Sequence, residues 1–165
     1  MVDKMEDDLD DLEEDTQKNK YLTFTLGKDS FGIEILFVTE IIGIQQITDV
    51  PDLPEYIKGI INLRGKIIPV MDVRSRFKKE PREYDERTCI IVVDIGEISI
   101  GLIVDRVSEV LDIPEESVSP PPKVSKNAQN KYVKGIGKIG EDVKLILDCE
   151  KLLSEEEIES ISEAV

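Results

Sequence analysis

The chain has 165 residues, of which 40% are hydrophobic, and this is enough for one domain with a buried core. Its 36 acidic and 21 basic residues give a formal net charge of −15, which argues against a nucleic-acid backbone or an anionic lipid surface as the main partner. No apolar run approaches the roughly 20 residues that span a bilayer, and the N-terminus lacks the regions of a signal peptide, so we expect a cytoplasmic protein without direct membrane insertion.

The residue types that are absent also restrict the chemistry. The chain contains no histidine, which excludes histidine-assisted nucleophiles, histidine metal ligands and phosphohistidine relays within it. Cys89 and Cys149 lie in apolar strand-like runs without a CxxC spacing, which favours buried, reduced thiols over a functional pair. We therefore expect no metal site and no cofactor.

Residues 1–20 form an acidic segment. They include nine acidic and three basic residues, and the run Glu6–Asp15 has no apolar stripe of helical spacing beyond Leu9 and Leu12. A segment of this composition cannot bury enough apolar surface to fold by itself. We therefore expect residues 1–20 to be a disordered tail and residues 21–165 to form the folded domain.

From residue 21 onward, short apolar runs alternate with turn signals. Residues 21–26 alternate in hydrophobicity, and the Gly-Lys-Asp-Ser sequence at 27–30 separates them from 31–35, which predicts a β-hairpin. A second hairpin is predicted from 89–93 and 98–104, and further strands from 59–63, 67–71, 133–139 and 143–147. Such strands with short connections favour small all-β barrels over a parallel α/β sheet.

One helix is predicted at the end of the chain, over residues 154–163. Ser154 and Glu157 have the spacing of a capping box, and acidic residues suit the first turn of a helix. Ile158 and Ile161 are three residues apart and share one face. We expect the helix to dock by that face.

The chain contains an internal repeat. Tyr56-Ile-Lys-Gly-Ile60 recurs as Tyr132-Val-Lys-Gly-Ile136, 76 residues later, and Asp72 then matches Asp148. Earlier matches have a spacing of 69: Gly27 with Gly96, Gly32 with Gly101, Val38 with Val107, Glu40 with Glu109, and Pro51 with Pro120. A single insertion in the Pro-rich segment 121–131 would explain the difference of seven. The repeat predicts two related β units, at about 21–86 and 87–153.

Arg64 distinguishes the two units. It interrupts the apolar stretch GIINLRGKIIPV (59–70), and the repeat places it opposite Gly140. A guanidinium group at this position must stay in water or pair with a carboxylate, and Glu40 is a candidate partner. From the residues alone, a solvated turn with Gly65 as its glycine and a functional arginine both remain open.

The sequence resembles the bacterial chemotaxis coupling proteins, the CheW-like family, from Tyr21 to Leu153. The resemblance is carried by FTLGKDSFGIEILFVTEI (24–41), YIKGIINLRGKIIPVMDVRSRF (56–77), SIGLIVDRVSEVL (99–111) and YVKGIGKIG (132–140). It implies two intertwined five-stranded SH3-like β-barrels, in agreement with the repeat. It also implies a non-catalytic adaptor that links chemoreceptor cytoplasmic tips to the regulatory domain of the chemotaxis histidine kinase, in membrane-associated arrays.

The resemblance also suggests binding residues. Arg64 matches an arginine that contacts the receptor, and Glu40 matches an acidic residue on the same receptor-binding side. Further candidates in and near the groove between the barrels are Val38, Gly59, Asn62 and Gly101. A groove with apolar walls accepts an apolar helix stripe, and Arg64 can orient that helix through carboxylate or carbonyl groups. For Gly59 and Gly101, backbone packing within a strand is the stronger explanation.

The kinase-facing surface is expected to use exposed apolar residues at the barrel ends. Ile44, Ile47 and Val124 are candidates, although burial in the core would explain each of them as well. The alternative functions are an enzyme, a nucleic-acid-binding barrel and an adaptor of another chemosensory-like pathway. No motif fixes two carboxylates at an active site, and the only basic cluster (74–79) lacks the stacking aromatics of a nucleic-acid groove.

Overall fold

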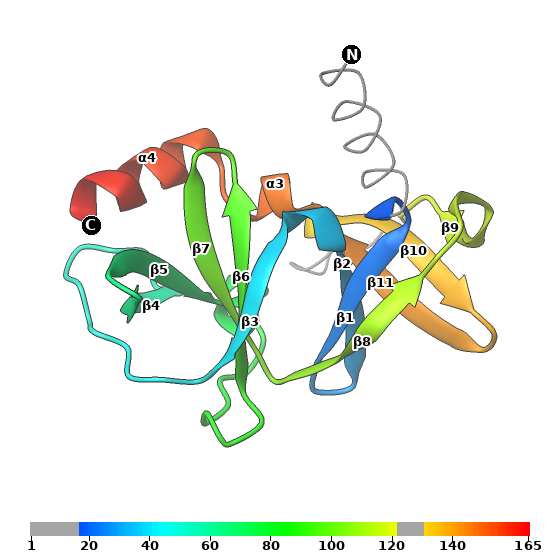
Figure 1. Cartoon of the computed structure of the whole chain (residues 1–165), viewed down its shortest axis with the longest axis horizontal. Coiled ribbons are helices and arrows are strands. Elements are labelled where there is room, and N and C mark those ends of the chain that lie inside the picture. Colours follow the sequence, from blue (N-terminus) through cyan, green and yellow to red (C-terminus); the bar gives the residue numbers. More distant parts are fainter. Residues whose placement is uncertain (1–16, 122–130) are drawn as a thin grey trace, which may run out of the picture.

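The computed structural model describes residues 17–121 and 131–165, which form two neighbouring β-barrels (Figure 1). Barrel A contains β1 (Lys20–Leu26), β2 (Asp29–Glu34), β8 (Arg106–Asp112), β9 (Val118–Ser119), β10 (Val133–Ile139) and β11 (Asp142–Leu147). Barrel B contains β3 (Val38–Gly43), β4 (Ile57–Leu63), β5 (Lys66–Asp72), β6 (Cys89–Ile95) and β7 (Ile98–Val104). The helical elements are η1 (Ile35–Phe37), α2 (Val73–Arg76), η2 (Glu115–Ser117), α3 (Cys149–Leu152) and α4 (Glu155–Ala164).

Each barrel takes strands from both halves of the chain. The β1–β2 hairpin of the first half pairs with β8 and with β11 of the second half, the latter in parallel. In the same way, the β6–β7 hairpin of the second half pairs with β3 and, in parallel, with β5 of the first half. The predicted pair of intertwined barrels is therefore confirmed. The two-residue strand β9 adds a sixth strand to barrel A.

The two barrels share one core. Because side chains alternate across a strand, β6 contributes Ile91 and Val93 to the largest buried cluster and Ile90 and Val92 to the interior of barrel B. The largest cluster also includes Phe24 of barrel A. Both sheets thus bury apolar residues in a common core, which holds the barrels together.

The repeat describes the strand pairing correctly but places part of the insertion wrongly. Ile57 pairs with Met71 as Val133 pairs with Leu147, at the predicted spacing of 76. However, the bridge between Thr48 and Ile60 corresponds to the pairing of Ser119 with Ile136, and Thr48 and Ser119 are 71 residues apart. The match of Pro51 with Pro120 is therefore wrong by two residues. The reason is the 3-10 turn η2, which adds residues before β9 and not after it.

The C-terminal helix is confirmed as α4, with the predicted capping box between Ser154 and Glu157. Its buried residue is Ile161, and Ile158 is half-buried against the common core. Arg76 of α2 holds the beginning of the helix. Its Nη2 donates to Oε1 of Glu157 at 2.8 Å, and its Nε donates to the carbonyl of Leu152 at 2.9 Å.

The two cysteines differ in burial. Cys149 is buried, and this burial raises the pKa of its thiol to about 12, whereas Cys89 is half-buried. The acidic segment expected to be a disordered tail lies, up to residue 16, outside the described residues. Within the part of the chain that the structure describes, no helix is both long and apolar enough to cross a membrane.

Candidate functional site

The hairpin of β4 and β5 presents Arg64 at its tip. Leu63 pairs with Lys66, so Arg64 and Gly65 form a two-residue turn. Both have positive φ, +53° and +86°, as in the type I′ turn that matches the twist of the strands. The Oδ1 atom of Asn62 accepts a hydrogen bond from the backbone N–H of Gly65 at 2.8 Å and so supports the turn. The turn holds Arg64 in a conformation that costs a non-glycine residue about 1 kcal/mol.

The equivalent turn in barrel A has a different geometry. It consists of Gly140 and Glu141, between the paired residues Ile139 and Asp142. Gly140 has φ +60°, but Glu141 is not among the residues with positive φ, as expected for a type II′ turn. The two halves therefore differ in backbone as well as in the residue at the tip.

Arg64 pairs with Glu40 across barrel B. Its Nη2 atom donates to Oε1 of Glu40 on β3. The Arg64 side chain is 73% exposed, and that of Glu40 is 28% exposed. The guanidinium group therefore has a carboxylate partner and also remains in water, and a functional role for it stays a prediction.

The fold gains little from this arginine. An exposed ion pair contributes about 0–1 kcal/mol, which is similar in size to the cost of a positive φ at a non-glycine residue. The two contributions roughly cancel, so packing and stability give no reason for an arginine at this turn. The guanidinium group has five N–H donors. Among the described residues, only Glu40 accepts a hydrogen bond from it.

Apolar side chains are exposed on β3 and on its counterpart β8. Ile41 on β3 is 44% exposed, and Val110 on β8, one repeat spacing later, is 51% exposed. These strands stand at the ends of the strand orders of their sheets and lie on the near side of the molecule in Figure 1. Val38, at the start of β3, is half-buried against the common core. These strands can therefore offer apolar contacts, although Ile41 points to the opposite face of β3 from Glu40, because side chains alternate along a strand.

The two candidate glycines are buried within strands. A Cβ atom at Gly59, which has φ +148°, would lie 2.1 Å from the carbonyl oxygen of Thr48. A Cβ atom at Gly101 would lie 2.7 Å from Cγ2 of Ile90. Close packing therefore explains both glycines, and a direct role in binding stays a prediction.

The candidate kinase-facing residues lie in different environments. Ile44 and Ile47 are half-buried and pack against the interior core of barrel B. Val124 falls outside the described residues. A role for these three residues in kinase binding remains a prediction, and the packing of Ile44 and Ile47 shows that each also serves the fold.

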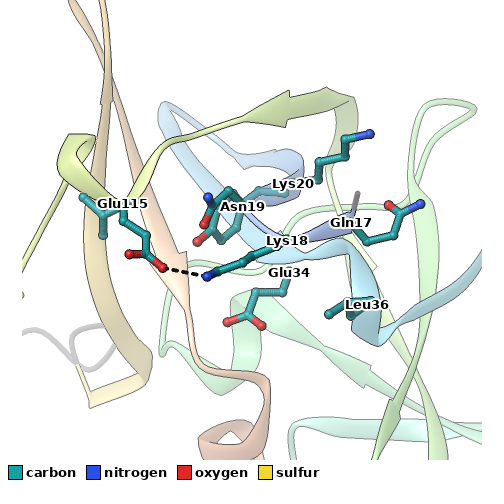
Figure 2. Close-up of a pocket in the computed structure, with 9 residues that line it drawn as sticks. Gln17, Lys18, Asn19, Lys20, Glu34, Leu36 and Glu115 are labelled. Carbon is teal, nitrogen blue, oxygen red and sulfur yellow. Dashed lines mark ion pairs between the residues drawn. The ribbon is translucent and has the colours of Figure 1, made fainter. Parts of the chain in front are cut away.

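The sequence did not predict a cleft of about 390 Å³ at one end of barrel A (Figure 2). Its charged side chains include Lys18 and Glu115, whose Nζ and Oε1 atoms are 3.4 Å apart. Burial, and then the charge of Glu115, raise the pKa of Tyr21 in its wall. The repeat aligns Tyr21 with Ile90, a residue that fills the core of barrel B. This difference between the two halves was a signal in the sequence that could have indicated the cleft.

Metal-binding side chains do not gather in the described residues. Between 17 and 121 and between 131 and 165, no group of three or more Cys, Asp or Glu residues could hold a metal ion. The candidate site is therefore a surface that contains an exposed cation and its carboxylate partner, on a strand that also exposes an apolar side chain on its other face. Such a surface is suited to contact with another protein.

Comparison with known proteins agrees with this arrangement. The family model described as the CheW-like domain matches residues 20–157. The chain belongs to the CheW-like family. It is 41% identical over 144 residues to the chemotaxis protein CheW of Klebsiella aerogenes, and the alignment covers 87% of each chain. It is 31% identical over 139 residues to the chemotaxis protein CheW of Thermotoga maritima, which covers 81% of this chain and 87% of the relative.

A solved structure supports the same conclusion. The crystal structure of the scaffolding protein TtCheW from Thermoanaerobacter tengcongensis is similar to this chain with a TM-score of 0.78 and 39% sequence identity. The similarity covers 84% of this chain and 94% of that one. The fold and the family together identify this CheW-like chain as a chemotaxis adaptor.

Proposed function

We propose that the Arg64 turn and the adjoining part of β3 dock the helical cytoplasmic tip of a chemoreceptor. The observation that carries this proposal is the exposed Arg64–Glu40 pair at a turn where an arginine adds little to stability. Ile41, which follows Glu40 on β3, is exposed and offers apolar contact on the other face of the strand. A helix with an apolar stripe and a carboxylate or carbonyl group near it would use both features.

The second proposed partner is the regulatory domain of the chemotaxis histidine kinase. The adaptor would hold receptor and kinase together without catalysing a reaction, in arrays at the cytoplasmic face of the membrane. This proposal is based on the membership of the chain in the CheW-like family and on the similarity of the chain to a protein described as a scaffold.

The experiment measures the binding of a receptor-tip fragment and of the kinase regulatory domain by calorimetry. Arg64→Glu is expected to weaken receptor binding at least about 30-fold, which corresponds to roughly 2 kcal/mol for a hot-spot arginine. Lys66→Glu is the matched control, because Lys66 is exposed, carries the same charge and lies two residues away. It should change receptor binding less than about threefold.

Circular dichroism checks that both variants fold. If Arg64→Glu binds the receptor tip as tightly as the unmodified protein, the assignment of the site is wrong. If the unmodified protein binds neither partner, the proposed adaptor partners are wrong. Binding of the kinase domain should be similar in both variants, because the candidate residues for that contact include neither Arg64 nor Lys66.

A further inference from the structure

The interior of barrel A differs from that of barrel B at a pair of facing residues. In barrel B, Ile90 of β6 pairs with Ile103 of β7, and both are buried in the interior core. At the repeat spacing of 69, their counterparts are Tyr21 of β1 and Glu34 of β2, which pair in the same way. Residues directly opposite each other on antiparallel strands share one face of the sheet. Tyr21 and Glu34 therefore both lie on the interior face of barrel A, where barrel B has two isoleucines.

A second pair of facing residues also differs, but its space is filled. Ile61 and Ile68 of barrel B correspond, at the spacing of 76, to Gly137 and Lys144. A Cβ atom at Gly137 would lie 3.1 Å from Cδ1 of Ile113, so Ile113 occupies the space that the glycine leaves. The cleft of about 390 Å³ lies at the other pair, which lines it. The mouth of a β-barrel is a common place for a ligand site.

The cleft contains both signs of charge in a loosely held pair. Nζ of Lys18 and Oε1 of Glu115 are 3.4 Å apart, and their side chains are 62% and 72% exposed. Glu34 is already paired with Lys134 of β10. The amine of Lys20 points away from the Lys18–Glu115 pair in Figure 2. Exposed ion pairs contribute little to stability, so a ligand can open this pair at small cost.

Apolar surface lies beside this ion pair. Leu36 of η1 is 58% exposed and Val118 of β9 is half-buried, and both line the cleft together with Tyr21. Burial raises the pKa of Tyr21, and the charge of Glu115 raises it further, which indicates that this hydroxyl group lies near the carboxylate. An aromatic ring next to a carboxylate suits an ammonium group.

We propose that this cleft binds a small zwitterion with an apolar side chain, such as an α-amino acid. Its ammonium group pairs with Glu115, and its carboxylate pairs with Lys18. Its side chain packs on Leu36 and Tyr21. A zwitterion replaces one ion pair by two, whereas an amine or an acid alone only exchanges one partner of the existing pair for another. The site lies in barrel A, so the proposal does not depend on receptor docking at Arg64.

Titration of the full chain with L-leucine, followed by amide spectra, tests the proposal. Signals of residues 18–21, 34–36 and 115–118 should shift until they saturate, with a Kd on the order of 1 mM. Isoamylamine lacks the carboxylate of leucine and isocaproate lacks its amino group. Each should bind about three- to fivefold more weakly, the range of one exposed ion pair. No saturable shift with leucine, or equal affinity for either analogue, would overturn the proposal.

Two variants remove the charges of the cleft one at a time. Lys18→Gln and Glu115→Gln should each weaken leucine binding about three- to fivefold. Lys28→Gln and Glu116→Gln are the matched controls, because both residues are exposed and neither lines the cleft. They should leave the Kd unchanged. Equal weakening by the controls would show a general charge effect and would rule out the proposed site.

A further variant gives barrel A the interior pair of barrel B. Tyr21→Ile combined with Glu34→Ile places apolar side chains at the cleft, so leucine binding should be lost while circular dichroism confirms the fold. Unchanged leucine binding in this folded variant would contradict the proposal. If the double variant does not fold, Lys18→Gln and Glu115→Gln still decide the question, because both side chains are largely exposed.

Discussion

Arg74 donates through Nε and Nη2 to the two carboxylate oxygens of Asp105. Asp105 lies at the corner between β7 and β8, and Arg74 belongs to α2, so this pair joins elements that are distant in sequence. The backbone N–H of Gly27 donates to the same carboxylate at 2.7 Å, and Arg82 adds a longer contact of 3.2 Å. One largely buried carboxylate therefore connects the β1–β2 turn, α2 and the segment that joins the two halves.

Asp105→Asn should destabilise the protein by about 3 kcal/mol. The substitution leaves the largely buried guanidinium group of Arg74 without its charged partner, and such losses cost about 3–5 kcal/mol in buried pairs. Urea unfolding followed by circular dichroism measures the change. Glu97→Gln in the exposed β6–β7 turn is the control and should stay within about 0.5 kcal/mol. Equal midpoints for the two variants would contradict the importance of the pair.

The stability of the protein should also fall in acid because of Asp105. Burial alone would raise the pKa of this carboxyl, but the hydrogen bonds from Arg74 and Gly27 outweigh it and hold the pKa below its usual value. The stabilisation is therefore fully present above the unfolded pKa of about 3.9 and is lost as the pH falls through the lower folded pKa. Urea midpoints between pH 7 and pH 2 should fall more steeply below about pH 4 in the unmodified protein than in Asp105→Asn. Parallel curves would disprove this.

Much of the fold could be predicted from local patterns. The hairpins at 21–35 and 89–104 follow from alternating hydrophobicity around turn residues, and Ser154 with Glu157 marks the final helix. The strands β3 and β8 were not predicted separately, because each has exposed positions along much of its length. The helices α2 and α3 have four residues each, too few for a helical period, and they depend on capping by Asp72 and Asp148.

The candidate site could be predicted only in part. The repeat identified Arg64 as an asymmetry and Glu40 as its candidate partner, and the family resemblance suggested that both lie on the receptor-binding side. The sequence could not show that both are largely at the surface of barrel B, because their pairing depends on how the β4–β5 hairpin folds against β3. The contact of Arg74 with Asp105 was missed for the same reason, since it joins residues 31 positions apart.

Replacement of Arg64 by asparagine should preserve or raise stability. Asparagine tolerates a positive φ better than arginine, which offsets the loss of an exposed ion pair worth about 0–1 kcal/mol. Arg64→Val should cost more than about 1 kcal/mol, because a β-branched side chain fits this conformation poorly. Thermal and urea unfolding measure both effects. Strong destabilisation by Arg64→Asn would show that the arginine serves the fold after all.

Gly59→Ala should destabilise the protein severely, by more than about 3 kcal/mol or to the point of misfolding. The new Cβ atom would meet the carbonyl of Thr48 at 2.1 Å, and φ +148° is unsuitable for other residues. Gly43→Ala is the matched control, because no atom lies within 4 Å of the Cβ position there. Urea unfolding compares the two. A Gly59→Ala variant with normal stability and lost receptor binding would instead assign Gly59 to the binding surface.

Arg76 fixes the C-terminal helix at the place where the two halves of the repeat meet. The centre of its guanidinium group lies 4.1 Å from the ring centroid of Tyr56 and 5.1 Å from that of Tyr132, which are equivalent residues in the repeat. Burial lowers the pKa of Arg76, although the guanidinium group stays charged at neutral pH. Its contacts with Glu157 and with the carbonyl of Leu152 require a planar group with several donors.

Arg76→Lys should therefore release α4 without unfolding the barrels. A lysine ammonium group cannot stack on both rings and bond Glu157 and the Leu152 carbonyl at the same time. Hydrogen exchange in residues 155–164 is expected to accelerate at least about tenfold, a loss of roughly 1.4 kcal/mol in local stability, while β6 and β7 remain protected. Arg87→Lys on an exposed segment is the control and should leave α4 unchanged. Unaltered exchange in α4 of the Arg76→Lys variant would mean that the apolar contacts of Ile158 and Ile161 and the hydrogen bond from Tyr56 to Glu157 hold the helix without Arg76.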